Sequence, residues 1–144
     1  MHFDYKAIPV DDPLPGAPAH AWVPVLRVRI IYGRARSKSL EAIVDSGSPW
    51  CLFHASIGEV LGMKVEQGHE CPVGGAVVGS TGSVFFHRIK LIVAGGTIEL
   101  RAGFSAKLAV AAILGREGFF DNHVITFNPQ ANPPGLEIER IYRA

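Results

Sequence analysis

The chain has few cysteines, little net charge and no long apolar run, and each absence excludes a class of protein. Its two cysteines, Cys51 and Cys71, are too few for the disulfide framework of a small secreted domain. A net charge of +1, with no basic run, gives no electrostatic case for nucleic acid or an anionic membrane as a partner. No apolar stretch approaches the ~20 residues of a membrane-spanning helix, and Asp4 and Lys6 interrupt any secretory signal. We therefore expect a cytoplasmic protein.

What is present indicates a small domain with one substantial core. The 144 residues are 48% hydrophobic, which is high for a domain of this length and suits a barrel with a buried oligomer interface. Four prolines lie within residues 1–21, so we expect an irregular N-terminal arm there. Residues 22–144 are then the folded domain.

Short segments with alternating apolar and polar residues dominate that domain, which is the pattern of half-buried strands. We expect strands at residues 23–32, 40–45, 89–93, 98–102, 108–114, 124–127 and 136–142. Gly95-Gly96 has the composition of a two-residue hairpin turn. A capping-box pattern that starts at Ser56 predicts a short helix over 56–61, and a second short helix is expected over 115–121. Together these elements predict an all-β, barrel-like fold.

The most informative segment spans residues 42–48 and reads Ala-Ile-Val-Asp-Ser-Gly-Ser. An apolar strand delivers Asp45 to its end, Gly47 permits a sharp bend, and the hydroxyls of Ser46 and Ser48 are positioned to hydrogen-bond the carboxylate. A second element, Ala-Ile-Leu-Gly at residues 112–115, ends another apolar run far downstream.

These two elements resemble the paired motifs of the retropepsin-like aspartic proteases, an early hydrophobic-hydrophobic-Asp-[Ser/Thr]-Gly and a late hydrophobic-hydrophobic-Gly. The similarity extends over residues 22–128. It implies a small closed β-barrel with one or two short helices. It also implies an aspartic endopeptidase that is a symmetric homodimer, has one catalytic Asp per subunit and needs no cofactor or metal.

The chemistry of peptide hydrolysis agrees with a two-chain site. Two carboxylates a few ångströms apart share one proton, so that one activates water as a base while the other protonates the carbonyl oxygen as an acid. Asp45 alone cannot supply both. The other four aspartates lie in no Asp-[Ser/Thr]-Gly turn. The second carboxylate is therefore expected from a second copy of the chain, with the pair titrating as a unit.

The resemblance assigns supporting roles to the neighbours of Asp45. Ser46 stands where the family usually has a Thr that bonds across the dimer axis, and Gly47 completes the turn. Ser48 is expected to donate a hydrogen bond to the Asp45 carboxylate, favour its charged form and shift activity toward acid pH. The late motif supplies Ile113, Leu114 and Gly115.

Two further features follow from the same comparison of motifs. Arg116 matches an arginine whose usual aspartate partner is replaced here by Pro49, so that Arg116 needs another acceptor. The glycine-rich residues 73–82 correspond in position to the flap that closes over substrate, with Gly74, Gly75 and Ala76 near its tip. The alternative is a surface loop without substrate contact.

Less specific interpretations stay open. Asp45 alone could cap a strand end as an ordinary Asx-turn residue. A retropepsin-like domain could also be catalytically silent and serve in dimerisation or peptide binding. The C-terminal strand could join a dimer sheet or cover a barrel edge. A third function is a small metal-binding β-domain, although its ligand spacing fits zinc poorly; its four candidate ligands are Cys51, His54, His69 and Cys71.

Overall fold

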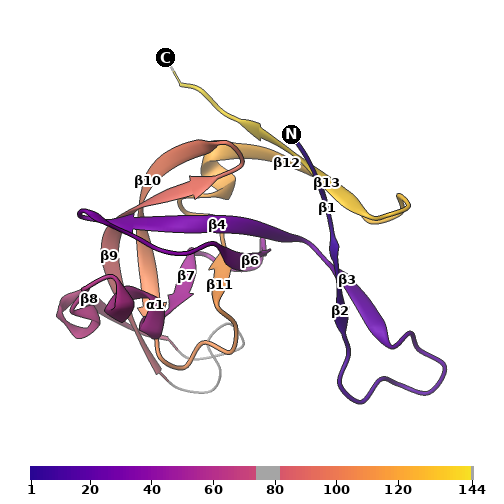
Figure 1. Cartoon of the computed structure of the whole chain (residues 1–144), viewed down its shortest axis with the longest axis horizontal. Coiled ribbons are helices and arrows are strands. Elements are labelled where there is room, and N and C mark those ends of the chain that lie inside the picture. The colour runs from indigo at the N-terminus through magenta and orange to yellow at the C-terminus, as the bar shows by residue number, and fades with distance from the viewer. Residues whose placement is uncertain (74–81, 144) are drawn as a thin grey trace.

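A closed ring of six strands forms the body of the protein in the computed structural model, which describes residues 1–73 and 82–143. The ring order is β4-β6-β11-β7-β10-β9, and pairing of β9 with β4 closes it. β5 extends the ring beside β4, and β8 lies beside β9 (Figure 1). The elements are β1 (His2–Asp4), β2 (Lys6–Pro9), β3 (His20–Val23), β4 (Val25–Tyr32), β5 (Ala35–Arg36), β6 (Leu40–Val44), β7 (Leu52–His54), α1 (Ala55–Val60), η1 (Val65–Gln67), β8 (His69–Val73), β9 (Gly82–Val93), β10 (Gly96–Ser105), β11 (Ala112–Leu114), η2 (Phe120–Asn122), β12 (His123–Asn128) and β13 (Gly135–Arg140). The predicted all-β class is confirmed. None of the helices described is long and apolar enough to cross a membrane.

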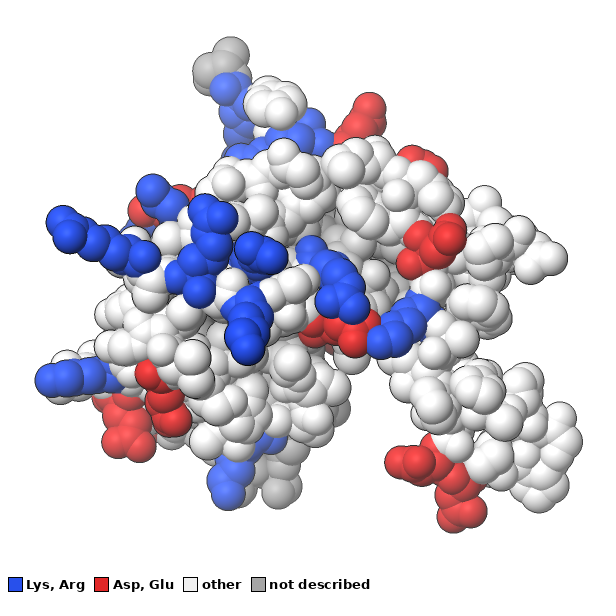
Figure 2. Space-filling view, in the orientation of Figure 1, with Lys and Arg blue, Asp and Glu red and all other residues white. Residues whose placement is uncertain are grey.

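Alternation along the strands separates the core from the surface, as the sequence predicts. In β4, Val28 and Ile30 are buried while Arg27 and Arg29 are exposed. The stacked rings of Phe53 and Phe104, both fully buried, lie within the main core. The outward-facing positions have a second effect: Figure 2 shows Lys and Arg side chains gathered over the face that carries β4. Cations that are scattered in the sequence are thus brought together by the pleat of the sheet.

The N-terminal residues are not irregular, contrary to the prediction. β1 pairs with β13 in an antiparallel ladder, and β2 pairs with β3 as a hairpin that projects from the barrel (Figure 1). The prolines misled the prediction because they lie at the end of β2 and in the loop of residues 10–19, where no ladder bond is needed. β3 also crosses the expected domain boundary between residues 21 and 22.

Three local predictions need correction. The β9–β10 turn consists of Ala94 and Gly95, one residue earlier than expected, and both have positive φ, as a type I′ hairpin requires. α1 begins after His54, whose ring nitrogen accepts a hydrogen bond from the Ser56 amide, so Ser56 lies inside the helix rather than at its cap. Gly62, with φ of 83°, follows the helix as predicted.

The late apolar run, residues 108–114, is the third region that differs from its prediction. Only its last three residues form a strand, β11, and all three are buried. The expected helix over 115–121 is replaced by turns and η2, although Phe119 is fully buried as predicted. The Phe120 amide donates to the Gly115 carbonyl and the Asp121 amide to the Arg116 carbonyl. Each bond reaches five residues back, one more than in an α-helix.

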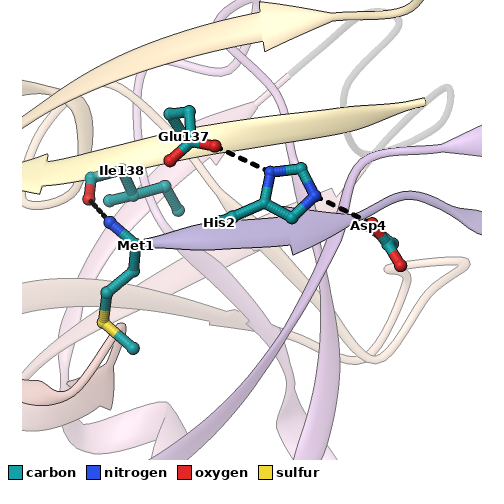
Figure 3. Close-up of polar contacts among 5 residues, drawn as sticks. All are labelled: Met1, His2, Asp4, Glu137 and Ile138. Atoms are coloured by element: carbon teal, nitrogen blue, oxygen red, sulfur yellow. Dashed lines mark hydrogen bonds and ion pairs between the residues drawn. The ribbon is translucent and has the colours of Figure 1, made fainter. Parts of the chain in front are cut away.

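A second sheet, β1-β13-β12, covers one side of the barrel. Leu136 and Ile138 of β13 are buried in the main core, so the C-terminal strand covers the barrel within a single chain. Figure 3 shows how β1 is held: the Met1 nitrogen donates to the Ile138 carbonyl, and His2 lies between two carboxylates. Its Nε2 is 2.8 Å from Asp4 Oδ1 and its Nδ1 is 2.7 Å from Glu137 Oε1.

This arrangement predicts a pH-dependent contribution to stability. Hydrogen bonds to Asp4 and then Glu137 raise the pKa of His2, because only the protonated ring donates from both nitrogens. The stabilisation is therefore complete below about pH 6.5, the unfolded value, and is lost as pH rises through the folded pKa. In urea unfolding, the stability difference between wild type and His2→Ala should be larger at pH 6 than at pH 8.5. His20→Ala, which removes an exposed histidine, is the control. An equal difference at both pH values contradicts the prediction.

Candidate active site

β11 lies between the two strands that flank the Asp45 turn. It pairs in parallel with β6, with Ile113 opposite Ile43, and antiparallel with β7, with Ile113 opposite Leu52. The Asp45 amide donates to the Leu114 carbonyl at 3.0 Å, which continues the parallel ladder by one residue. The late motif therefore holds the early motif through its main chain. The Leu114 side chain itself points into the main core, where it is fully buried.

The carboxylate of Asp45 is half-buried and fixed through one oxygen. Oδ1 accepts a hydrogen bond from the Gly47 amide at 2.8 Å, while the Asp45 carbonyl accepts one from the Ser48 amide at 3.2 Å. Ser46 and Gly47, at the tip of the turn, are exposed. Among the described residues no donor bonds the second carboxylate oxygen. The turn thus presents one oriented carboxylate at the surface.

The predicted role of Ser48 in bonding this carboxylate is wrong for the single chain. Its side chain is fully buried, and its hydroxyl donates to the Trp50 carbonyl at 2.7 Å. Ser48 therefore holds the backbone that follows the turn and does not bond the Asp45 carboxylate. A direct effect of Ser48 on the charge of Asp45 is therefore not supported.

Gly115 lets the segment that follows β11 approach the segment that follows the Asp45 turn closely. The Arg116 amide donates to the Ser48 carbonyl and the Glu117 amide to the Pro49 carbonyl, each at 2.9 Å. A Cβ at residue 115 would collide with the Trp50 carbonyl oxygen and lie 2.7 Å from the Ser48 oxygen. These are backbone atoms that cannot move aside as a flexible side chain could.

Arg116 finds the acceptor that the sequence left open. Its Nη1 donates to the Ser46 carbonyl at 2.8 Å, so the guanidinium steadies the exposed tip of the Asp45 turn. The other carboxylates of the late segment are engaged in their own contacts. Asp121 accepts from the Gly118 amide at 2.9 Å, and Glu117 pairs with Arg101 at 3.0 Å.

Trp50 and a small apolar cluster beside it were missed by the sequence analysis. The half-buried Trp50 ring packs edge-to-face against Phe86, with ring centroids 5.2 Å apart. This cluster is separate from the main core; its buried members are Leu52, Val84, Phe86, Leu108 and Ile113, with Trp50, Cys71 and Val110 partly buried against it. The signal available in the sequence was a large aromatic residue directly after the acidic turn. Trp50 and this cluster form an apolar surface next to the strands that carry the turn.

The four residues of the metal-binding interpretation do not converge. Cys51 and His54 are at β7, whereas His69 and Cys71 are in β8, and β10 and β9 lie between these strands. Burial raises the pKa of the Cys51 thiol to about 12, which disfavours the thiolate that a metal needs. Its sulfur instead contacts the Glu117 carbonyl at 3.5 Å. Within residues 1–73 and 82–143 no group of three or more metal-binding side chains is found.

The predicted flap residues Gly74, Gly75 and Ala76 lie outside the described residues. The strands on either side, β8 and β9, form an antiparallel pair from His69 opposite Phe86 to Val73 opposite Gly82. The two strands therefore extend to both ends of this segment, and the assignment of Gly74, Gly75 and Ala76 to a flap stays a prediction.

Comparison with known proteins finds similarity among solved structures only at a distance. The sequence matches no known family model, and no curated protein matches it. The chain is similar to a structure described as EIAV protease complexed with the inhibitor HBY-793, with 20% sequence identity and a TM-score of 0.49. The alignment covers 65% of this chain and 82% of the other. A similarity this distant assigns no activity to the chain.

The close approach at residue 115 gives a direct test of the site geometry. Gly115→Ala should lower the free energy of unfolding by about 3 kcal/mol, because the new methyl group meets fixed carbonyl groups. Gly96→Ala is a matched control, since the nearest atom to its new Cβ is 4.0 Å away, and it should change stability by only about 0.5 kcal/mol. Urea denaturation measures both. Equal stability of the two variants would show that the segments are not packed this tightly.

Proposed function

We propose that this chain is a retropepsin-like aspartic endopeptidase that is active as a homodimer. The observation that carries the proposal is the Asp45 turn itself: a half-exposed carboxylate, oriented by the Gly47 amide and clamped from behind by an inserted strand. An ordinary strand-end Asx turn requires the bond from the backbone amide to the carboxylate, but it does not require the inserted strand. The proposal goes beyond the fold, since one fold supports many functions.

In the proposed mechanism, two Asp45 carboxylates face each other across a two-fold axis. They share one proton because like charges this close cannot both ionise. The ionised member takes a proton from water, while the protonated member gives its proton to the carbonyl oxygen of the scissile bond. The water oxygen bonds to the carbonyl carbon, and the C–N bond breaks when the amine leaves with a proton returned by the pair.

The surroundings of the turn support an extended, largely apolar peptide as substrate. Extended peptides bind to proteins mainly through main-chain hydrogen bonds, with pockets for alternate side chains. The partly buried side chains of Trp50, Cys71 and Val110 form an apolar surface over Leu52 and Ile113, which are ladder neighbours in β7 and β11. Arg116 and Gly115 act as positioning residues because they hold the turn without contributing a reactive group.

Asp45→Asn should abolish peptide cleavage while leaving the fold intact. Asparagine has the same shape but cannot share or transfer the proton, so the cleavage rate should fall by at least about 100-fold. The measurement is hydrolysis of a quenched fluorescent peptide library from acid to neutral pH. Glu59→Gln, which changes an exposed carboxylate in α1, should retain wild-type activity.

Mixing the two chains tests whether the site is shared. With a ninefold excess of the Asp45→Asn chain, most wild-type subunits pair with an inactive partner, and activity per wild-type chain should fall to about one tenth. If activity stays proportional to the amount of wild-type chain at every excess of the Asp45→Asn chain, each site is complete within one chain. A dimer without any cleavage favours instead the catalytically silent dimerisation or peptide-binding domain.

A further inference from the structure

The hairpin of β2 and β3 projects from the barrel with apolar side chains that nothing in the described chain covers. In Figure 1 it extends away from the ring, and Figure 2 shows a notch between its outer part and the barrel. Leu14 is 78% exposed and Trp22 is 53% exposed. Two-stranded hairpins are marginally stable alone in water, so this hairpin would gain stability by packing against another surface.

The base of this hairpin is attached to the strand that carries the candidate catalytic residue. The Val44 amide, one residue before Asp45, donates to the carbonyl of Pro24, which directly follows β3, at 2.9 Å. On the other strand, the Lys6 ammonium pairs with Glu41 of β6 at 2.6 Å. The base of the hairpin is therefore bonded to β6 on both of its sides, and β6 is the strand that ends at the exposed turn.

We propose that residues 6–23 form an arm that packs against a second copy of this chain, with Trp22 and Leu14 as its main apolar anchors. This rests on the proposed function, in which the site is incomplete until a second Asp45 arrives. Because Pro24 at the base of the arm bonds the residue before Asp45, a molecule that brings its own turn to this one comes close to the arm. Because a two-fold interface is self-complementary, each copy then receives the arm of the other.

The chemistry of the arm fits a protein surface as the occupant. Tryptophan supplies a large contact area at little cost in conformational entropy and is enriched among the residues that dominate interface energies. A second copy is the protein that the half-site already requires.

Self-association of the full chain tests the arm. Sedimentation equilibrium should show that the double variant Leu14→Ser, Trp22→Ser raises the dimer dissociation constant at least tenfold over wild type. The matched control is Val60→Ser, Tyr142→Ser, which removes an aliphatic and an aromatic side chain that are 86% and 88% exposed elsewhere. It should change the constant less than twofold. All four side chains are more than half exposed in the single chain, so both variants should fold, which circular dichroism checks.

A second measurement reports on the arm directly. In a Trp50→Phe background Trp22 is the remaining tryptophan, and its quenching by acrylamide should decrease as the protein concentration passes through the dimer range. Quenching that is independent of concentration while the protein dimerises overturns the proposal.

The outcomes separate this inference from the proposed function. An unchanged dissociation constant in the arm variant, with Asp45-dependent cleavage intact in wild type, overturns the arm and leaves the endopeptidase. Loss of dimer in the arm variant, with no Asp45-dependent cleavage in wild type, supports the arm and refutes the endopeptidase. A wild-type chain that is monomeric at every concentration refutes both.

Discussion

The insertion of β11 between β6 and β7 is the constraint on which the rest of the structure depends. Its three residues link β6 to β7 within the closed ring and at the same time fix the turn that leaves β6. The main-chain bonds continue past the strand, from Asp45 to Leu114 on one side and from Arg116 and Glu117 back to Ser48 and Pro49 on the other. These groups are polar backbone atoms at a partly buried site, so each needs its partner. The turn is therefore held by main-chain bonds on both sides.

The electrostatics of the turn follow from this rigidity. A half-exposed carboxylate with one amide donor keeps much of its hydration, so a single chain can carry it at little cost. The arrival of a second carboxylate would remove that hydration and add a like charge, and a shared proton relieves both. The Asp45 carboxylate is thus compatible with a stable single chain and, in the proposed dimer, with proton transfer.

The sequence predicted what depends on local patterns. Alternation identified β4, β9, β10 and β13, and an apolar run identified β6. The strand-turn-glycine pattern located Asp45 and Gly115, because burial and turn geometry act on neighbouring residues. The sequence analysis missed β1, β2, β5, β7 and the cap of α1. β1 is a strand because it pairs with β13, at the other end of the chain, and His54 caps the helix because β7 ends there. The direction of the Ser48 hydroxyl was equally beyond reach. Its acceptor, the Trp50 carbonyl, is only two residues away, but the backbone path after the turn decides that the hydroxyl faces this carbonyl and not Asp45.

The long sequence separation between β6 and β11 has a consequence for how the protein is made. Contacts between residues this far apart form late, since closing a long loop costs entropy before any bond is gained. A ribosome-bound chain that has exposed residues 42–48 but not yet residues 112–117 contains the acidic motif without the geometry that orients it. If Asp45 acts as proposed, its chemistry starts only when the barrel is complete, and nascent chains are then unable to cleave one another during synthesis.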